Sequence, residues 1–161
     1  MNKSPVFTLT ATISLLLDQW SKTYIDNHFE LSQSKQVITN FFHLTYVRNP
    51  GAAFGMLAEN AIRVPFFITV SAIAILAILW YVRRISSEKQ WQVFALGLIF
   101  SGASGNLIDR IRLGEVIDFF DVHWYNYHWP AFNIADSAIC VGVTIMPVSY
   151  THLTLPTLCS V

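Results

Sequence analysis

The chain has 161 residues, of which 53% are hydrophobic and only 12% are charged, and its 10 basic and 10 acidic residues give a formal net charge of zero. Soluble domains carry roughly 25% charged residues, so a chain with this composition and a mean hydropathy of +0.45 lacks the polar surface to cover itself in water. No dense Lys/Arg patch favours nucleic acid as a partner. Cys140 and Cys159 have neither disulfide-framework nor metal-ligand spacing. The composition therefore predicts a small integral membrane protein.

Four apolar stretches predict four transmembrane helices, at about 5–25, 64–82, 91–108 and 129–146. The second is the clearest, because a helix of that length extends about 28 Å, against a hydrocarbon core of roughly 30 Å. The first reaches this length only by continuing through Asp18 and Lys22. We interpret it as an uncleaved helix rather than a signal peptide, because no small-x-small cleavage site follows it. The third is rich in Gly and Ser, which allow helices to approach closely.

The polar segments give the expected orientation. Lys3 precedes the first helix and the 83–90 loop contains three cations, so both are expected on the cytoplasmic side. Residues 26–61 and 109–128 are then extracytoplasmic. Within about 29–57, β-branched and aromatic residues alternate with turn residues, which predicts short strands and a small sheet at the membrane surface. Residues 1–146 form a single predicted domain. The Thr/Pro-rich tail 147–161 is atypical, and we hypothesise that it is a frameshifted or vector-derived end.

Two polar groups are expected at the outer ends of the first helix and the β-rich segment. Asp18 and Lys22 are four residues apart and share a helix face, either as a structural ion pair or as a pair that orients a site. Asn49 and Gly51 belong to a turn before the second helix. That turn is either purely structural or places the Asn49 amide where it can hold a peptide backbone.

A third polar group ends the third helix. Asn106 and Arg110 are four residues apart on one expected face. The Arg110 guanidinium can donate two hydrogen bonds to a carboxylate, with Asp109, Asp118 or a lipid phosphate as candidate acceptors. An ordinary helix end with a snorkelling arginine is the alternative.

Asp118 and Asp136 are the candidate catalytic residues. Asp136 lies within the fourth apolar stretch and is expected to share a helix face with Asn133, while Asp118 is flanked by apolar residues. An ionisable residue in such a segment is costly and is by default functional. Two adjacent carboxylates can share a proton, one acting as base and the other as acid. Asp121 is interpreted instead as a solvated loop residue. The competing function is a small transporter or ion-pathway subunit that relays protons through Asp18 and Asp136, and a non-catalytic scaffold is a further alternative.

Three histidines, His43, His123 and His128, are potential metal ligands. The last two lie in a run of Trp and Tyr residues, which favour membrane interfaces. We therefore interpret this run as an aromatic belt and expect no metal site.

Five motifs occur together in one order: DQWSK at 18–22, NPGAAF at 49–54, GNLIDR at 105–110, VIDF at 116–119 and FNIADS at 132–137. With them, roughly residues 5–146 resemble the lipoprotein signal peptidase family, also called signal peptidase II. The resemblance implies an all-α polytopic membrane protein with four transmembrane helices and a small extracytoplasmic β-cradle.

The resemblance also implies an activity. The expected enzyme is an aspartyl endopeptidase of the bacterial cytoplasmic (inner) membrane, with Asp118 and Asp136 as its dyad near the extracytoplasmic face. Its expected substrates are diacylglyceryl-modified prolipoproteins, cut just before the lipidated cysteine. It is expected to act as a monomer among membrane phospholipids, without cofactor or metal, and to be inhibited by globomycin. The expected supporting residues are Asp18, Lys22, Asn49, Gly51, Asn106, Asp109, Arg110 and Asn133.

Overall fold

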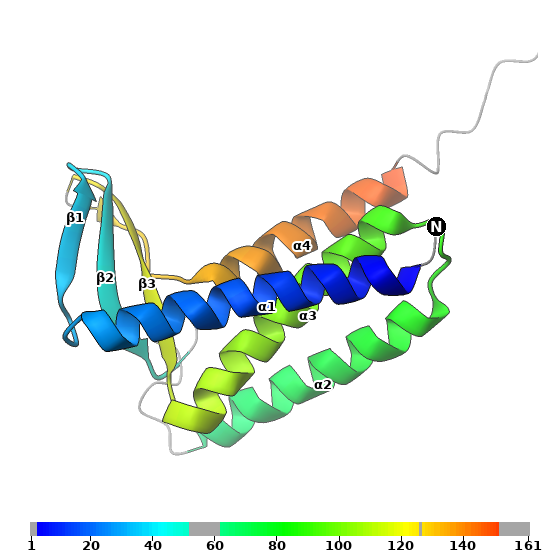
Figure 1. The fold of residues 1–161 in the computed structure, drawn as a ribbon, viewed down its shortest axis with the longest axis horizontal. Coiled ribbons are helices and arrows are strands. Elements are labelled where there is room, and N and C mark those ends of the chain that lie inside the picture. The colour runs from blue at the N-terminus through cyan, green and yellow to red at the C-terminus, as the bar shows by residue number, and fades with distance from the viewer. Residues whose placement is uncertain (1–2, 52–61, 126, 152–161) are drawn as a thin grey trace, which may run out of the picture.

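The computed structural model describes residues 3–51, 62–125 and 127–151, which form four helices and a four-stranded antiparallel sheet. The helices lie along one another, and the sheet stands at one end of them, with its strands running across the helix direction (Figure 1). In chain order the elements are α1 (Lys3–His28), β1 (Ser34–Ile38), β2 (Phe42–Asn49), α2 (Arg63–Arg84), α3 (Gln90–Leu113), β3 (Val116–Trp124), β4 (Tyr127–His128) and α4 (Ile134–Thr151).

All four predicted helices are present, but the predicted bounds of the last are wrong. Residues 129–133 are not helical; α4 begins at Ile134 and continues to Thr151, past the predicted end at 146. The physical reason is that the backbone of Phe132 pairs with β3. Its N–H donates to the Phe120 carbonyl at 3.1 Å, and its carbonyl accepts from the Phe120 N–H at 2.8 Å, so these groups are not available to a helix. Local apolarity cannot distinguish such a segment from a helix.

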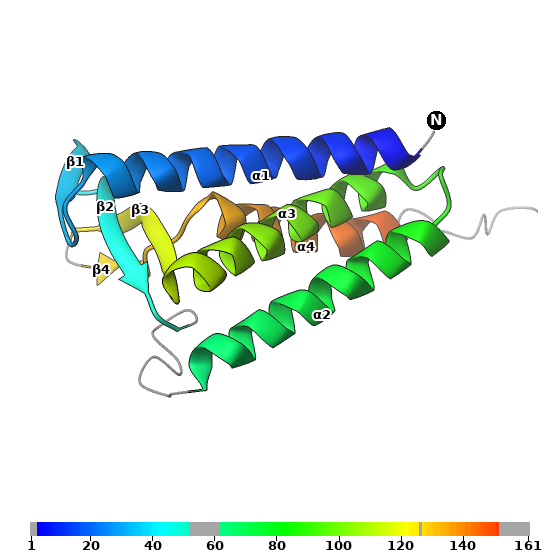
Figure 2. The ribbon, with the colours of Figure 1, turned by 60° about the horizontal axis from the view of Figure 1, so that its bottom comes forward.

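Helix α3 is the centre of the bundle and contacts α1, α2 and α4 (Figure 2). Small residues make these contacts close, as the sequence predicts. A Cβ added to Gly102 would lie 2.3 Å from the carbonyl oxygen of Ala135 on α4, and one added to Gly105 would lie 2.3 Å from Asp18 Oδ2 on α1. Both distances are far below van der Waals contact, so only a residue without a side chain fits at these two positions of α3.

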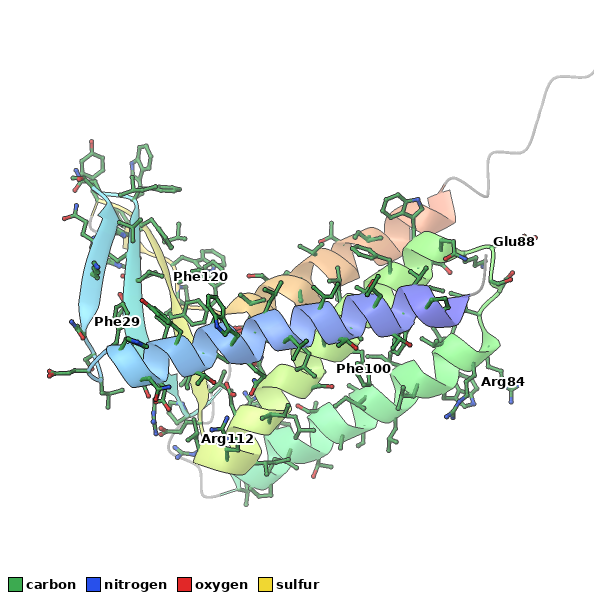
Figure 3. All side chains as sticks on the ribbon, in the orientation of Figure 1. Phe29, Arg84, Glu88, Phe100, Arg112 and Phe120 are labelled. Atoms are coloured by element: carbon green, nitrogen blue, oxygen red, sulfur yellow. The ribbon has the colours of Figure 1, made fainter. Side chains whose placement is uncertain are left out.

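By length and composition, α2 and α3 are apolar enough to cross a membrane, and Ile134–Met146 of α4 is a shorter apolar helix. Large apolar side chains on the outside of α2 are exposed, among them Phe66, Val70, Ile73 and Leu76. Side chains project from all sides of the bundle, including the outer face of α2 (Figure 3). An exposed apolar surface of this extent is typical of a protein surrounded by lipid.

The sheet has the order β1-β2-β3-β4. The strands predicted between 29 and 57 are confirmed as β1 and β2, but the prediction that Asp121 lies in a solvated loop is wrong, since it is on β3 together with Asp118. The β-branched and aromatic content of this segment was a signal for a strand. Gly114, at φ +73°, ends α3 in the left-handed conformation typical of a helix C-terminus and turns the chain into β3.

An apolar cluster attaches the sheet to the bundle: Ile25 of α1, Tyr46 of β2, and Ile117 and Phe119 of β3 are all buried together. At its edge, Arg48 of β2 forms an ion pair with Asp26 of α1 at 3.0 Å. These contacts fix β2 and β3 relative to the helix ends, which is what allows residues from strands and helices to build one site.

Candidate active site

Asp118 projects from β3 into the junction between the sheet and the bundle. Its side chain is 2% exposed and accepts two short hydrogen bonds, from Asn133 Nδ2 to Oδ1 at 2.7 Å and from Asn49 Nδ2 to Oδ2 at 3.0 Å. The pairing of β2 with β3 supplies the second contact, because Val47 lies opposite Asp118 and Asn49 opposite Val116. The sheet register therefore positions the Asn49 amide on the carboxyl.

Asp136 lies in the first turn of α4 and is half-buried. Its Oδ1 accepts from Asn106 Nδ2 at 2.8 Å and its Oδ2 accepts from the backbone N–H of Asn133 at 3.3 Å. In return, Asn133 Oδ1 accepts from the Asp136 N–H at 2.9 Å. This reciprocal pair is a capping box, so Asn133 precedes the helix instead of sharing a helical face with Asp136 as predicted.

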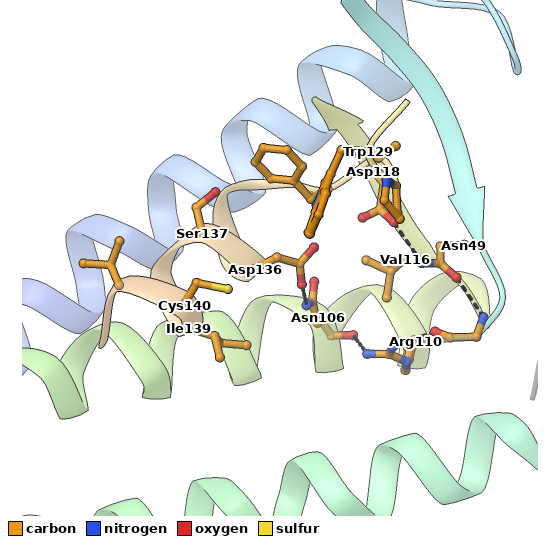
Figure 4. A pocket seen from close by; sticks show the side chains of 15 residues that line it. Asn49, Asn106, Arg110, Val116, Asp118, Trp129, Asp136, Ser137, Ile139 and Cys140 are labelled. Carbon is orange, nitrogen blue, oxygen red and sulfur yellow. Dashed lines mark hydrogen bonds between the residues drawn. The ribbon is translucent and has the colours of Figure 1, made fainter. Parts of the chain in front are cut away.

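Asn133 thus joins the two carboxyl groups, since its side chain donates to Asp118 and its backbone donates to Asp136. In Figure 4 the labelled carboxyl groups of Asp118 and Asp136 border the same space, one from the strand and one from the helix. Burial of the Asp118 carboxyl, together with the negative charge of Asp136, raises the pKa of Asp118 to about 7. A proton is therefore retained on Asp118 near neutral pH.

The two carboxyl groups line a cavity of about 530 Å³. Six of its lining residues are polar, and most of the others are apolar (Figure 4). The polar lining residues are Asn49, Asn106, Arg110, Asp118, Asp136 and Ser137; the others are Gly51, Val116, Trp129, Pro130, Ala131, Phe132, Ile139, Cys140 and Val141. A cavity of this form suits a largely apolar ligand whose one polar group reaches the carboxyls.

A buried charge network lies behind Asp136. Lys22 Nζ lies 3.0 Å from Asp18 Oδ2 and 2.9 Å from Asp109 Oδ2, and it donates to Asn106 Oδ1 at 2.9 Å. The predicted Asp18–Lys22 ion pair is therefore confirmed, and all three charged side chains are at most 2% exposed. Because Asn106 accepts from Lys22 through Oδ1, its Nδ2 is oriented towards Asp136.

The same network reaches the backbone of two neighbouring elements. Asp18 Oδ1 accepts from the N–H of Ala135 in α4 at 2.9 Å, and Asp109 Oδ2 accepts from the N–H of Ile117 in β3 at 3.3 Å. Gln19, to which the sequence analysis assigned no role, donates to Asp109 Oδ1 at 3.2 Å. Its place in the DQWSK motif was the signal for it.

Among the described residues, Arg110 does not form the bidentate pair with a carboxylate that the sequence suggested. Its Nη1 and Nη2 donate to the carbonyl oxygens of Asn106 at 3.4 Å and Gly51 at 3.2 Å, and its guanidinium lies 4.7 Å from the centre of the Phe67 ring. Asn49 Oδ1 accepts from the Gly51 N–H at 3.0 Å. Arg110 and Asn49 together therefore hold the end of the turn at Gly51, while residues 52–55 of the same motif lie outside the described residues.

The apolar bundle and the paired carboxyls are features expected of a membrane enzyme, and comparisons with known proteins show the class and the family. A solved structure described as a bacterial membrane enzyme, obtained in meso at 2.3 Å resolution, is similar with a TM-score of 0.85 and 31% identity over 96% of this chain and 93% of that one. The family model for signal peptidase (SPase) II matches residues 10–152.

Curated relatives agree with this match. A lipoprotein signal peptidase of Geobacter sulfurreducens is 54% identical over 143 residues, 89% of this chain and 89% of the relative. Another, from Syntrophotalea carbinolica, is 50% identical over 141 residues, 88% of each chain. The chain belongs to the signal peptidase II family and is a peptidase. The transporter alternative is set aside, because the matched family is one of peptidases.

Proposed function

We propose that the chain is an aspartyl endopeptidase that removes the signal peptide from diacylglyceryl-modified prolipoproteins, cutting just before the lipidated cysteine. The observation that carries the proposal is the linkage of Asp118 and Asp136 through Asn133 in the lining of a largely apolar cavity. The names of the curated relatives supply the substrate class.

In the proposed mechanism the two carboxyls take different roles. Asp118 keeps its proton and donates it to the oxygen of the scissile carbonyl, because burial and the neighbouring charge raise its pKa to about 7. Asp136 is the ionised base that removes a proton from the attacking water. Two close carboxylates cannot both ionise cheaply, so the pair shares one proton, as in the aspartic proteases that are the standard example of this effect. The reaction uses no metal and no organic cofactor.

The supporting residues hold this arrangement. Asn49 and Asn133 donate to Asp118, and Asn106 and the Asn133 backbone donate to Asp136, so both carboxyl groups are held in a fixed orientation. Lys22 with Asp18 and Asp109 orients Asn106. Arg110 donates to the Gly51 carbonyl, and both residues line the cavity, where they would contact the substrate backbone.

We infer that all four helices span the bacterial cytoplasmic (inner) membrane, with the sheet and the dyad at the extracytoplasmic face. Helix α1 contains charged residues, but Asp18 and Lys22 are paired inside the bundle. Its outward surface is apolar, with Leu9, Leu16 and Trp20 each more than 60% exposed. Exposed Trp and Tyr side chains beside β3 and β4 suit an interfacial position. The enzyme is expected to work as a monomer.

The test is cleavage in detergent of two matched precursors, one diacylglyceryl-modified and one with an unmodified cysteine. We expect a gel shift for the lipidated precursor, inhibition of that shift by globomycin, and cleavage of the unmodified precursor slower by at least about 10-fold, since lipid contacts contribute binding energy in the transition state. Equal cleavage of the two precursors would contradict the substrate class, and no cleavage of either would contradict the activity.

The role of Asp118 as the acid makes a separate prediction about pH. Only the form with Asp118 protonated is active, so kcat/KM is expected to reach half of its maximum near pH 7 and to fall about tenfold per unit well above that pH as Asp118 loses its proton. The measurement is a profile of initial cleavage rates from about pH 5.5 to about pH 9, with recovery of activity on return to the acidic end as the control for unfolding. A profile that stays flat across this range would exclude Asp118 as the acid.

A further inference from the structure

One face of the sheet carries four ionisable side chains that the active site does not use: His43 of β2, Asp121 and His123 of β3, and His128 of β4. Strand pairing brings them together, because His43 lies opposite Asp121 and His123 lies opposite His128. None of the four lines the cavity with the carboxyl dyad. They stand at the end of the molecule away from the N-terminus, where the sheet is drawn in Figure 1.

The geometry of this cluster is compact. One ring nitrogen from each of His43 and His123 and one carboxylate oxygen of Asp121 lie within 4.8 Å of one another. The His43 and His123 ring centroids are 4.3 Å apart. The two oxygens of the Asp121 carboxylate have different neighbours. Oδ1 lies 2.8 Å from His128 Nδ1, and Oδ2 lies 3.9 Å from His43 Nδ1.

A second observation concerns His123 alone. This side chain is only 6% exposed, and its Nδ1 is buried without a hydrogen-bond partner among the described residues. A buried polar atom without a partner is costly and is rare in folded proteins. In the tautomer protonated at Nε2, the Nδ1 lone pair is available to a cation, whereas stacking of the imidazole rings leaves it unsatisfied.

We propose that His43, Asp121 and His123 bind a divalent transition-metal ion of the zinc type, with His128 orienting the Asp121 carboxylate. Two imidazoles and a carboxylate form a ligand set that Zn²⁺ uses with water in the fourth position. In a tetrahedral site the ligand atoms lie roughly 3.3 Å apart, given metal–ligand bonds of about 2.05 Å. The present separations reach up to 4.8 Å. Binding of the ion would require rotations of these side chains that shorten the separations to the tetrahedral value. The His128 contact is the outer hydrogen bond that commonly fixes a ligand.

The proposed ion would link β2 to β3. Asp121 is three residues from Asp118, or about 10 Å along the strand. Asn49, which donates to Asp118, is on β2. The ion would therefore stabilise the two strands that supply part of the carboxyl site, and a ligand bound only by the folded state raises the unfolding temperature. This inference does not depend on the peptidase activity.

The test is a titration of the full-length, tag-free protein in detergent, first treated with EDTA, with ZnCl2 by isothermal calorimetry. We expect one Zn²⁺ per chain and an increase in unfolding temperature. His43→Ala, Asp121→Asn and His123→Gln should each weaken binding at least about 10-fold, whereas His28→Ala, which changes an exposed histidine at the end of α1, should not. CoCl2 in place of ZnCl2 should give the absorption bands of a tetrahedral complex.

Each outcome decides the proposal. Failure of the folded, EDTA-treated protein to take up Zn²⁺ would overturn it, and so would binding that is unchanged in the three cluster variants. A cluster variant that does not fold is replaced by His128→Ala, which keeps all three ligands and should weaken binding by a smaller factor. The cleavage assay remains an independent measurement, so loss of zinc binding and loss of peptidase activity can be distinguished.

Discussion

Replacing Asp118 or Asp136 with asparagine is expected to reduce the rate of prolipoprotein cleavage by roughly 10²–10⁴-fold, the usual contribution of a general acid or base. An asparagine amide at position 118 cannot supply the proton that the buried carboxyl retains, and one at position 136 cannot accept a proton from water. Each substitution preserves side-chain size, so the cavity is maintained. The measurement is the initial rate of the gel shift of a diacylglyceryl-modified precursor in detergent, at matched enzyme concentration.

Glu30→Gln is the matched control, because it makes the same chemical change at an exposed residue between α1 and β1. Its rate should equal that of the unchanged chain. The effects of the two aspartate substitutions should not add in the double variant, because residues that act as a unit lose their whole contribution when either is removed. Cleavage that persists at a comparable rate in either single variant would refute the dyad.

The second large effect is expected at Lys22, where substitution by methionine should destabilise the protein by about 3–5 kcal/mol, the usual cost of removing one partner from a buried charge group. Asp18 and Asp109 both contact the Lys22 ammonium and are nearly inaccessible to solvent. Without it they are left as uncompensated charges inside the bundle. Thermal unfolding in detergent measures the loss, and activity should fall with it because Asn106 loses its fixed orientation.

Two further variants separate charge from packing. Lys35→Met removes an exposed lysine from β1 and should leave the unfolding temperature unchanged. The triple variant Asp18→Asn, Lys22→Met and Asp109→Asn removes all three charges together and should be more stable than Lys22→Met alone, because no isolated charge remains buried. If Lys22→Met unfolds at the temperature of the unchanged chain, the network contributes nothing to stability.

The hydrogen bonds around the dyad come from several elements. Asn133 caps the start of α4, Asn106 is on α3, and Asn49 ends β2, so three separate parts of the fold hold the two carboxyls. Helix α3 can approach α1 and α4 this closely only because Gly102 and Gly105 have no side chain. The site is therefore sensitive to packing positions that never contact substrate.

The membrane class, the four helices, the first two strands and the two candidate catalytic aspartates could all be predicted from the amino-acid sequence. These features are local: apolar runs, β-branched alternation and ionisable residues at costly positions can each be recognised without knowing what lies opposite. The five motifs also indicated the family that the comparisons then established.

How those residues meet depends on the tertiary structure. The start of α4 and the partners of Arg110 arise from contacts between segments far apart in the chain. The local pattern predicted the start of α4 wrongly, and it did not indicate the contact of Arg110 with the Gly51 carbonyl. The same pattern placed Asp121 in a loop, although pairing with β2 holds it in a strand. The histidine cluster is a further case, because His43 reaches Asp121 only through the register of β2 against β3. Periodicity specifies which face a side chain occupies, whereas the identity of its neighbour is set by register and packing, which no single segment encodes.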